Sequence, residues 1–200
     1  MTMINASLPV HRQSLYHVDA IDGFQVPVRL SGPDKGRVVI MFDGTPDTTD
    51  SYDIVRERLH VAMFRTVVLP THEGLSSKAI IGILDRLKAA GGLLVGDGAG
   101  GELAWDLAAT YRERFTGLVV VDCGHPRVPN DGGVIRDKHC PAVEVDTTAL
   151  VSTRAAHGVA RASRRYVHGE FRLVELAGPR KSRHFTAQLT AEIVVRALSR

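Results

Sequence analysis

Short apolar runs alternate with amphipathic stretches along the whole chain, and this alternation predicts a sheet covered by helices. Two early runs alternate apolar and polar residues, as strands with one exposed face do, whereas several later runs are apolar throughout, as strands buried on both faces are. The expected strands are residues 13–20, 24–30, 37–42, 65–69, 92–95, 118–121, 142–145 and 171–176. The expected helices are residues 51–61, 76–89, 102–115, 151–167 and 185–198. This order predicts an α/β fold that begins with an antiparallel pair of strands.

The composition is that of a globular protein. The 200 residues are 44% hydrophobic and 24% charged, and a chain of this length can form about one domain with a full core. No apolar run reaches the ~18 residues of a membrane-spanning helix, and the first residues lack the pattern of a signal peptide. Cys123 and Cys140 cannot form a disulfide framework. We therefore expect a single domain over residues 1–200 in the cytoplasm, without membrane association.

Positive charge gathers late in the sequence. Lys and Arg outnumber Asp and Glu by ten to three in residues 154–200, although the net charge of the chain is only +3. Such a segment is either an anion-binding site or the solvated face of a helix. No aromatic residues are interleaved with the basic ones in the manner that stacking on bases requires. We do not expect nucleic acid as a partner, and the role of the basic segment 154–183 stays open.

A glycine-rich turn, GDGAGG at residues 96–101, follows a buried strand and precedes a helix. Gly96, Gly98 and Gly101 match the dinucleotide-binding pattern G-x-G-x-x-G, and Asp122 follows about 20 residues later, where an acid would hold a ribose hydroxyl. That pattern normally follows the first strand of its fold, whereas several expected strands precede it here. Asp97 also places a negative charge beside the phosphate position. Dinucleotide binding is therefore an alternative hypothesis.

Three segments resemble the α/β-hydrolase family. Residues 93–122, LLVGDGAGGELAWDLAATYRERFTGLVVVD, resemble its nucleophile-elbow strand, turn, helix and next strand. Residues 41–59 resemble its oxyanion loop, and residues 174–198 resemble its last strand, histidine loop and final helix. The resemblance implies a three-layer sandwich with about eight strands, mostly parallel. The family often inserts a helical cap after its sixth strand, but residues 124–140 are too few for one.

The family's elbow pattern, G-x-nucleophile-x-G, places Gly98 at the nucleophile position. Glycine has no oxygen or sulfur with which to attack a carbonyl. Shifting the pattern by one residue makes Asp97 the nucleophile, but it then places Val95 and Ala99 where the tight turn requires small, unhindered residues. The other interpretation of Asp97 is that its side chain caps the following helix.

The resemblance also assigns a base and an acid. His184 lies just after the last expected strand and is the candidate catalytic base. Asp146 is the candidate acid, although it comes earlier than the family's usual position, near Leu150 here. Asp146 can alternatively begin a turn. Without a nucleophile, His184 has no hydroxyl to activate.

The oxyanion loop departs from the family as well. Asp43 precedes Gly44 where the family usually has histidine, and the resemblance assigns the oxyanion-hole donors to the backbone N–H groups of Thr45 and Ala99. A carboxylate at Asp43 would oppose a developing negative charge. Three positions thus depart from the family pattern together: Gly98 replaces the nucleophile, Asp43 replaces the oxyanion-loop histidine, and the acid Asp146 is displaced. Together they indicate a site that no longer performs hydrolysis.

The sequence therefore predicts a non-catalytic α/β-hydrolase-like scaffold with a small molecule or a protein in its cleft, and homo-oligomer formation stays open. One alternative is an active hydrolase of ester-type substrates that uses Asp97, or an activated water, with His184. We expect no cofactor. Acids at the carboxyl edge could gather around a metal with His125 and His184, but no ligand spacing in the sequence is diagnostic, so we expect no metal.

Overall fold

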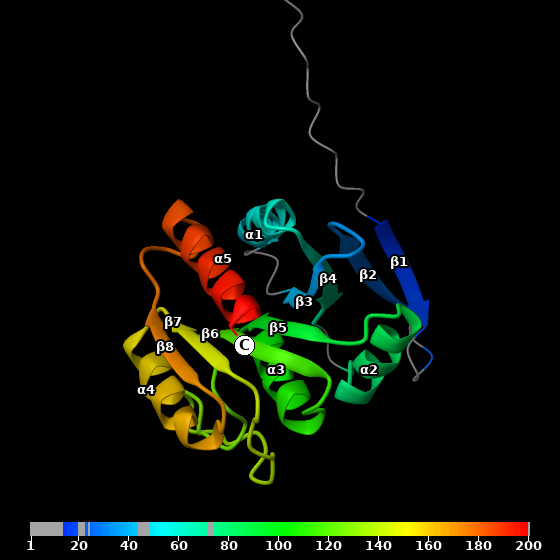
Figure 1. Cartoon of the computed structure of the whole chain (residues 1–200). Coiled ribbons are helices and arrows are strands. Elements are labelled where there is room, and N and C mark those ends of the chain that lie inside the picture. Colours follow the sequence, from blue (N-terminus) through cyan, green and yellow to red (C-terminus); the bar gives the residue numbers. More distant parts are fainter. Residues whose placement is uncertain (1–13, 20–22, 24, 44–48, 72–73, 200) are drawn as a thin grey trace, which may run out of the picture.

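The computed structural model describes residues 14–19, 23, 25–43, 49–71 and 74–199, and its centre is an eight-stranded sheet of order β1-β2-β4-β3-β5-β6-β7-β8 (Figure 1). The strands are β1 (Ser14–Asp19), β2 (Gln25–Ser31), β3 (Arg37–Asp43), β4 (Phe64–Pro70), β5 (Gly92–Asp97), β6 (Phe115–Val121), β7 (Thr147–Val151) and β8 (Phe171–Glu175). β1 and β2 are antiparallel to their neighbours, and β3 to β8 are mutually parallel. The expected antiparallel start and mostly parallel sheet are confirmed.

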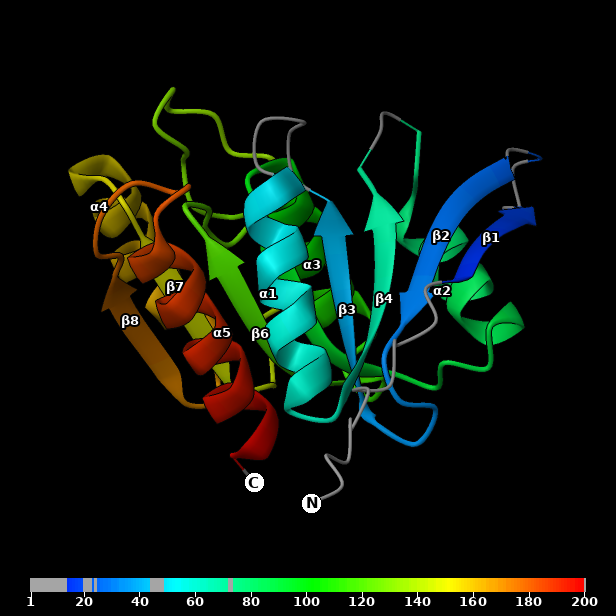
Figure 2. The same cartoon turned by 90° about the horizontal axis from the view of Figure 1, so that it is seen from above.

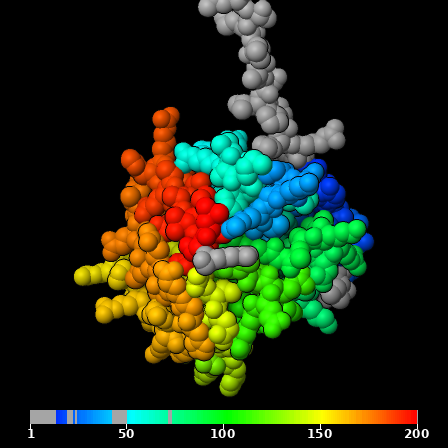
Figure 3. Space-filling model, viewed as in Figure 1, coloured from blue at the N-terminus to red at the C-terminus, as the bar shows by residue number. Residues whose placement is uncertain are grey.

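Helices cover both faces of this sheet. α1 and α5 lie on one face, and α2, α3 and α4 lie on the other (Figure 2). The helices are α1 (Thr49–Val61), α2 (Ser77–Arg86), α3 (Ala99–Thr110), α4 (Arg154–Ser163) and α5 (Arg183–Leu198), with a short 3₁₀ turn, η2 (Arg164–Tyr166), after α4. Figure 3 shows the surfaces of α1 and α5 side by side, and Arg58 donates a hydrogen bond of 3.2 Å to Thr186 between them.

Two hydrophobic cores lie on the two faces of the sheet. Side chains of successive strand residues point to opposite faces, so Ile40 and Phe42 join the core under α2, α3 and α4, while Val39 and Met41 join the core under α1 and α5. Burial on both faces explains why the parallel strands are apolar throughout. No helix among the described residues is both long and apolar enough to cross a membrane.

The seventh strand differs from its prediction. The strand expected at residues 142–145 is wrong, because β7 covers Thr147–Val151 and Val143 makes only an isolated bridge with Val167. Thr147 and Thr148, which follow Asp146, are buried in β7, and both of their hydroxyls are satisfied. Thr147 donates to the carbonyl of Val145 at 3.1 Å, and Thr148 accepts from Nε of Arg196 at 3.0 Å. β-Branched threonine fits a strand once its hydroxyl has a partner.

Candidate functional site

The nucleophile-elbow geometry is present at Gly98. β5 ends at Asp97 and α3 begins at Ala99, with Gly98 between them at φ 53° and ψ −120°. A Cβ atom built on Gly98 would meet no other atom within 4 Å, so a side chain here would stand in open space. This is the position that the family pattern gives to the nucleophile, and the residue present carries no reactive atom.

The neighbouring glycines are explained by close packing. A Cβ on Gly96 would lie 2.2 Å from the carbonyl oxygen of Gly100, and one on Gly101 would lie 2.3 Å from Sγ of Cys123. The strand, the helix and the end of β6 approach too closely for any side chain at these positions. Close packing thus accounts for Gly96 and Gly101, and the positive φ accounts for Gly98, so the G-x-G-x-x-G spacing does not require a bound pyrophosphate.

Asp97 is buried and holds two donors. Its Oδ2 accepts a hydrogen bond of 3.0 Å from the hydroxyl of Tyr52 on α1, and it forms an ion pair with Arg180. Burial, and next the negative charge of Asp97, raise the pKa of Tyr52 well above its ordinary value, so the phenol stays protonated and donates. The helix-cap interpretation of Asp97 is wrong, because the N-cap residue of α3 is Gly98 and no side chain caps the helix.

Arg180 also reaches Asp122, which follows β6. Its second terminal nitrogen forms an ion pair with Oδ2 of Asp122. Asp122 has a positive φ of 49°, and its carboxylate also accepts from the backbone N–H of Ser152 at 2.6 Å and from the Ser152 hydroxyl. Every strong acceptor of Asp122 is therefore engaged within the protein. This weighs against the role in holding a ribose hydroxyl.

One guanidinium thus joins the carboxyl ends of β5 and β6. Burial lowers the pKa of Arg180, but hydrogen bonds and charge from Asp97 and Asp122 outweigh it and raise that pKa above its ordinary value. In the sequence, Arg180 is only one of several basic residues in the segment 154–183. Arg180 lies between the last strand and His184, in the loop where the family resemblance places site residues. This position is the signal that could have identified Arg180.

His184 is exposed in the first turn of α5, and no described side chain hydrogen bonds to its imidazole. Asp146 lies far from it. Asp146 precedes β7, at the amino edge of the sheet, and its Oδ2 is 3.4 Å from Nη1 of Arg196. Arg196 follows His184 by twelve residues of α5, which is about 18 Å along the helix axis. The structure therefore does not bring the candidate base and acid together.

The oxyanion loop is described only in part. The backbone of Asp43 ends β3 and pairs with Pro70, so Asp43 lies at the carboxyl edge as expected. Gly44 and Thr45, the other residues assigned to this loop, lie outside the described residues. Ala99 is the exposed first residue of α3, beside Gly98.

Two cavities lie at the start of α3, one lined by Gly98 and the other by Ala99. One of about 200 Å³ is lined by Gly98, Asp122 and Cys123 together with the connection from β6 to β7, and a second of about 370 Å³ adjoins Ala99. Glu102 and Arg136 line both, and they form an ion pair of 3.3 Å that ties the connection to α3. Burial, then the charge of Asp97, raises the pKa of the Cys123 thiol, so it is not a thiolate nucleophile at neutral pH.

The connection from β6 to β7, residues 122–146, contains no helix and no strand. His125 belongs to this connection and was a candidate metal ligand. Its Nε2 lies 2.8 Å from the carbonyl of Pro141, its Nδ1 accepts from the N–H of Arg127, and its ring stacks on Tyr166. Within the described ranges, no three His, Cys, Asp or Glu side chains are arranged to hold a metal ion.

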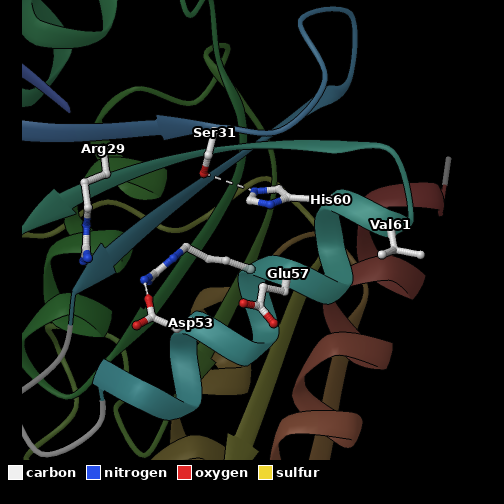
Figure 4. Close-up of a pocket in the computed structure, with 7 residues that line it drawn as sticks. Arg29, Ser31, Asp53, Glu57, His60 and Val61 are labelled. Carbon is white, nitrogen blue, oxygen red and sulfur yellow. Dashed lines mark hydrogen bonds and ion pairs between the residues drawn. The ribbon is translucent and has the colours of Figure 1, made fainter. Parts of the chain in front are cut away.

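A separate polar cluster, which the sequence did not suggest, lies at the amino edge of the parallel strands. It borders a cavity of about 550 Å³ between β2 and α1 (Figure 4). Oγ of Ser31 is 3.2 Å from Nε2 of His60, and Oγ1 of Thr66 is 3.0 Å from the serine and 2.9 Å from the imidazole. All three side chains are buried, so the two hydroxyls and the ring nitrogen satisfy one another.

Solved structures show what this architecture resembles. An esterase from Exiguobacterium antarcticum is 15% identical, with a TM-score of 0.73 over 92% of this chain and 99% of that one. Epoxide hydrolase A from Mycobacterium thermoresistibile is 13% identical, with a TM-score of 0.68 over 90% and 98% of the two chains. A haloalkane dehalogenase variant from Bradyrhizobium elkanii is 11% identical, with a TM-score of 0.68 over 92% and 97%.

No protein-family model matches the sequence, and a search of curated proteins finds no significant match. The structural likenesses, together with the strand order and the elbow, show that the chain has the α/β-hydrolase fold. This confirms the fold implied by residues 41–59, 93–122 and 174–198. A shared fold does not assign a reaction, so the function is argued from the site itself.

Proposed function

We propose that this protein is a non-hydrolytic member of its fold class, which binds a small molecule or a protein in the cleft beside Gly98 without cleaving it. The observation that carries the proposal is the elbow itself. Its backbone at Gly98 is held at the positive φ of a nucleophile position, yet no nucleophile is present. Acyl transfer in this fold requires an activated oxygen or sulfur there.

The charges around the elbow support the same conclusion. A carboxylate nucleophile must be free to attack, but Asp97 is buried, ion-paired with Arg180 and hydrogen-bonded by Tyr52. Its negative charge is therefore stabilised in the ground state, which lowers its nucleophilicity. The alternative of a hydrolase that uses Asp97 would have to break this ion pair in every turnover.

The candidate base does not compensate. A general base acts within hydrogen-bond reach of the proton it removes and is oriented by a partner. The imidazole of His184 is exposed and has no described partner to orient it. The short connection from β6 to β7 also leaves the cleft without the helical enclosure that excludes water from an active site.

The cleft is suited to binding. The cavity at Gly98 and the cavity at Ala99 share Glu102 and Arg136, and they offer both charged and apolar walls. Ligand sites in open α/β sheets lie at the carboxyl edge, as these cavities do. Both cysteines are free thiols, which agrees with the expected reducing, cytoplasmic setting.

Activity measurements test the proposal directly. We expect the wild-type protein to hydrolyse p-nitrophenyl acetate no faster than the same buffer without protein, and to remain unlabelled by a fluorophosphonate probe. The Gly98→Ser variant supplies an elbow hydroxyl and should gain no turnover, because no imidazole is positioned to activate it.

Two further variants locate any activity that does occur. Wild-type hydrolysis that His184→Ala abolishes would support the hydrolase alternative, and hydrolysis that Ser31→Ala abolishes would assign catalysis to the cluster in Figure 4. Either result would overturn the non-hydrolytic proposal. Circular dichroism of each variant establishes that it is folded.

A further inference from the structure

Basic residues are concentrated in α4 and η2, and α4 packs against β7 and β8 (Figure 1). Residues 152–169 contain four arginines and two histidines but no Asp or Glu. The sheet-facing side of α4 is formed by small buried residues, Ala156, Ala160 and Ser163, while Arg161 and Arg165 are exposed. The structure thus places positive charge outward, with no acid from the same segment to neutralise it.

The arginines of this surface lack the ion pairs found elsewhere. Seven arginines in other parts of the described chain pair with Asp or Glu. Arg127, Arg161 and Arg165 form no such pair with any described residue. Asp137 lies in the same connection as Arg127. It accepts a hydrogen bond of 2.8 Å from the backbone N–H of His139 and pairs with none of these three arginines. A counter-ion for these three arginines must therefore come from outside the described residues, although His168 nearby pairs with Glu144.

Two of these arginines share one aromatic ring. The guanidinium carbons of Arg127, from the connection after β6, and Arg165, from η2, lie 5.4 Å and 4.9 Å from the centre of the Tyr166 ring. They are therefore no more than about 10 Å apart, and both are attracted to the same π-system. Two like charges within this distance of each other, neither of them paired with a described acid, favour the binding of an anion that contacts both.

The Tyr166 ring is itself packed against other aromatic side chains. His125 stacks on Tyr166 with ring centres 4.7 Å apart, and Trp105 packs edge-on against His125 at 5.5 Å. Burial lowers the pKa of His125 to about 4, so this imidazole is neutral at physiological pH and does not itself attract an anion. Both guanidinium groups therefore lie against a tyrosine ring whose position is set by its packing on His125.

We propose that Arg127 and Arg165, which both contact the Tyr166 ring, bind the dianionic phosphate group of a phosphate monoester together with Arg161, one helical turn earlier. Guanidinium forks match phosphate oxygens in geometry as well as charge. A phosphate monoester carries close to two negative charges at neutral pH and can neutralise both arginines, whereas a single carboxylate can neutralise only one. This site is separate from the cleft beside Gly98.

Calorimetric titration at pH 7.5 and constant ionic strength tests the site. We expect saturable binding of inorganic phosphate to the full chain, weakened at least tenfold in Arg165→Gln and in Arg127→Gln. Arg183→Gln is the matched control, because Arg183 is also exposed and has no described acidic partner. Glycerol 3-phosphate and a phosphoserine peptide, each with its unphosphorylated counterpart, show whether the phosphate comes from a small ester or from a protein.

Several results would overturn the proposal. These are an absence of saturable phosphate binding, binding that survives in the Arg127→Gln/Arg165→Gln double variant, or an equal loss in Arg183→Gln. Because Arg127 also packs near His125, its variant could fold poorly. Arg165 is exposed, so Arg165→Gln alone then decides the question. Tighter binding of duplex DNA than of any monoester, lost in the same variants, would assign the surface to a different ligand and would also contradict the monoester site.

Discussion

An arginine bridges two carboxylates at each edge of the sheet, but the two bridges differ in which charge is buried. At the carboxyl edge, the side chain of Asp97 is 4% exposed and that of Arg180 is 32% exposed. At the amino edge the order is reversed, with Arg196 2% exposed and Glu170 63% exposed. The first bridge holds a buried negative charge, whereas the second holds a buried positive charge whose acidic partners reach water.

The difference shows what each bridge does. A buried carboxylate without a partner is costly, and Asp97 has only Arg180 as a cationic partner among the described residues. The guanidinium beside Gly98 is therefore needed to keep the end of β5 folded, and the acids it holds are not available for chemistry. At the amino edge, the exposed acids can be solvated even when their arginine is removed.

The comparison predicts that Arg180→Met is the most destabilising of the charge changes. We expect the free energy of unfolding at pH 7 to fall by about 3 kcal/mol, because Asp97 would be left buried and unpaired. Urea denaturation followed by circular dichroism measures the loss. Arg180→Lys, which keeps the charge but cannot bridge both acids, should lose less. A loss below about 1 kcal/mol for Arg180→Met would show that water enters and solvates Asp97.

His125 belongs to neither arginine bridge, and its burial makes the free energy of unfolding depend on pH. Its pKa of about 4 lies below the ordinary value of about 6.5, so the unfolded chain binds more protons than the folded chain between these values. Stability from neutral His125 is complete above about pH 6.5 and declines as the pH falls towards 4. We expect a loss of about 2 kcal/mol between pH 7 and pH 5.

Urea denaturation across this pH range measures the effect. The His125→Asn variant cannot titrate at this position, so the dependence of its stability on pH should be shallower by the same amount, whatever its stability at pH 7. An unchanged pH dependence in His125→Asn would attribute the acid sensitivity to carboxylates instead, including those of the two bridges.

Arg196→Met tests the amino-edge bridge and should cost less than Arg180→Met. We expect a loss of about 1.5 kcal/mol, because the apolar chain of methionine fills most of the buried space while Glu170 turns to water. The hydrogen bond from Arg196 to Thr148 is also lost. Thermal unfolding of the two variants side by side ranks them. Equal losses, or a larger one for Arg196→Met, would refute the distinction between the edges.

Gly98→Ser should have the smallest effect on stability, at about 1 kcal/mol. The cost arises from the positive φ, since a side chain there would meet no atom within 4 Å. Gly101→Ala is the matched comparison, because its Cβ would lie 2.3 Å from the sulfur of Cys123, and we expect a clearly larger loss. If both variants lose the same amount in urea denaturation, backbone conformation rather than space limits this turn.

Most of the fold could be predicted from the sequence because local pattern and burial agree in most elements. The apolar run of β3 and the amphipathic spacing of α2 each indicate one structure. β7 could not be predicted, because Thr147 and Thr148 require partners that come from Val145 and from Arg196, and the latter is distant in the sequence. Only the folded chain brings that arginine to the strand.

The backbone turn of the candidate site could be predicted from the sequence, but the ion pairs around it could not. The glycine spacing indicated the elbow at Gly98, since such turns depend on local residue types. The bridge from Arg180 to Asp97 and Asp122 joins residues more than fifty positions apart, and no local pattern encodes it. The role of Asp146 depended on the position of β7, so the error in that strand also displaced the acid.

α5 and the loop before it supply the arginine of both bridges. A ribosome releases Asp97 and Asp122 well before Arg180 and Arg196, so the earlier strands emerge with carboxylates that have no cationic partner yet. Docking of α5 neutralises both ends of the sheet at one time. During biosynthesis, the docking of α5 should therefore be the last step that completes the fold. A nascent chain stalled before residue 180 would stay dependent on chaperones.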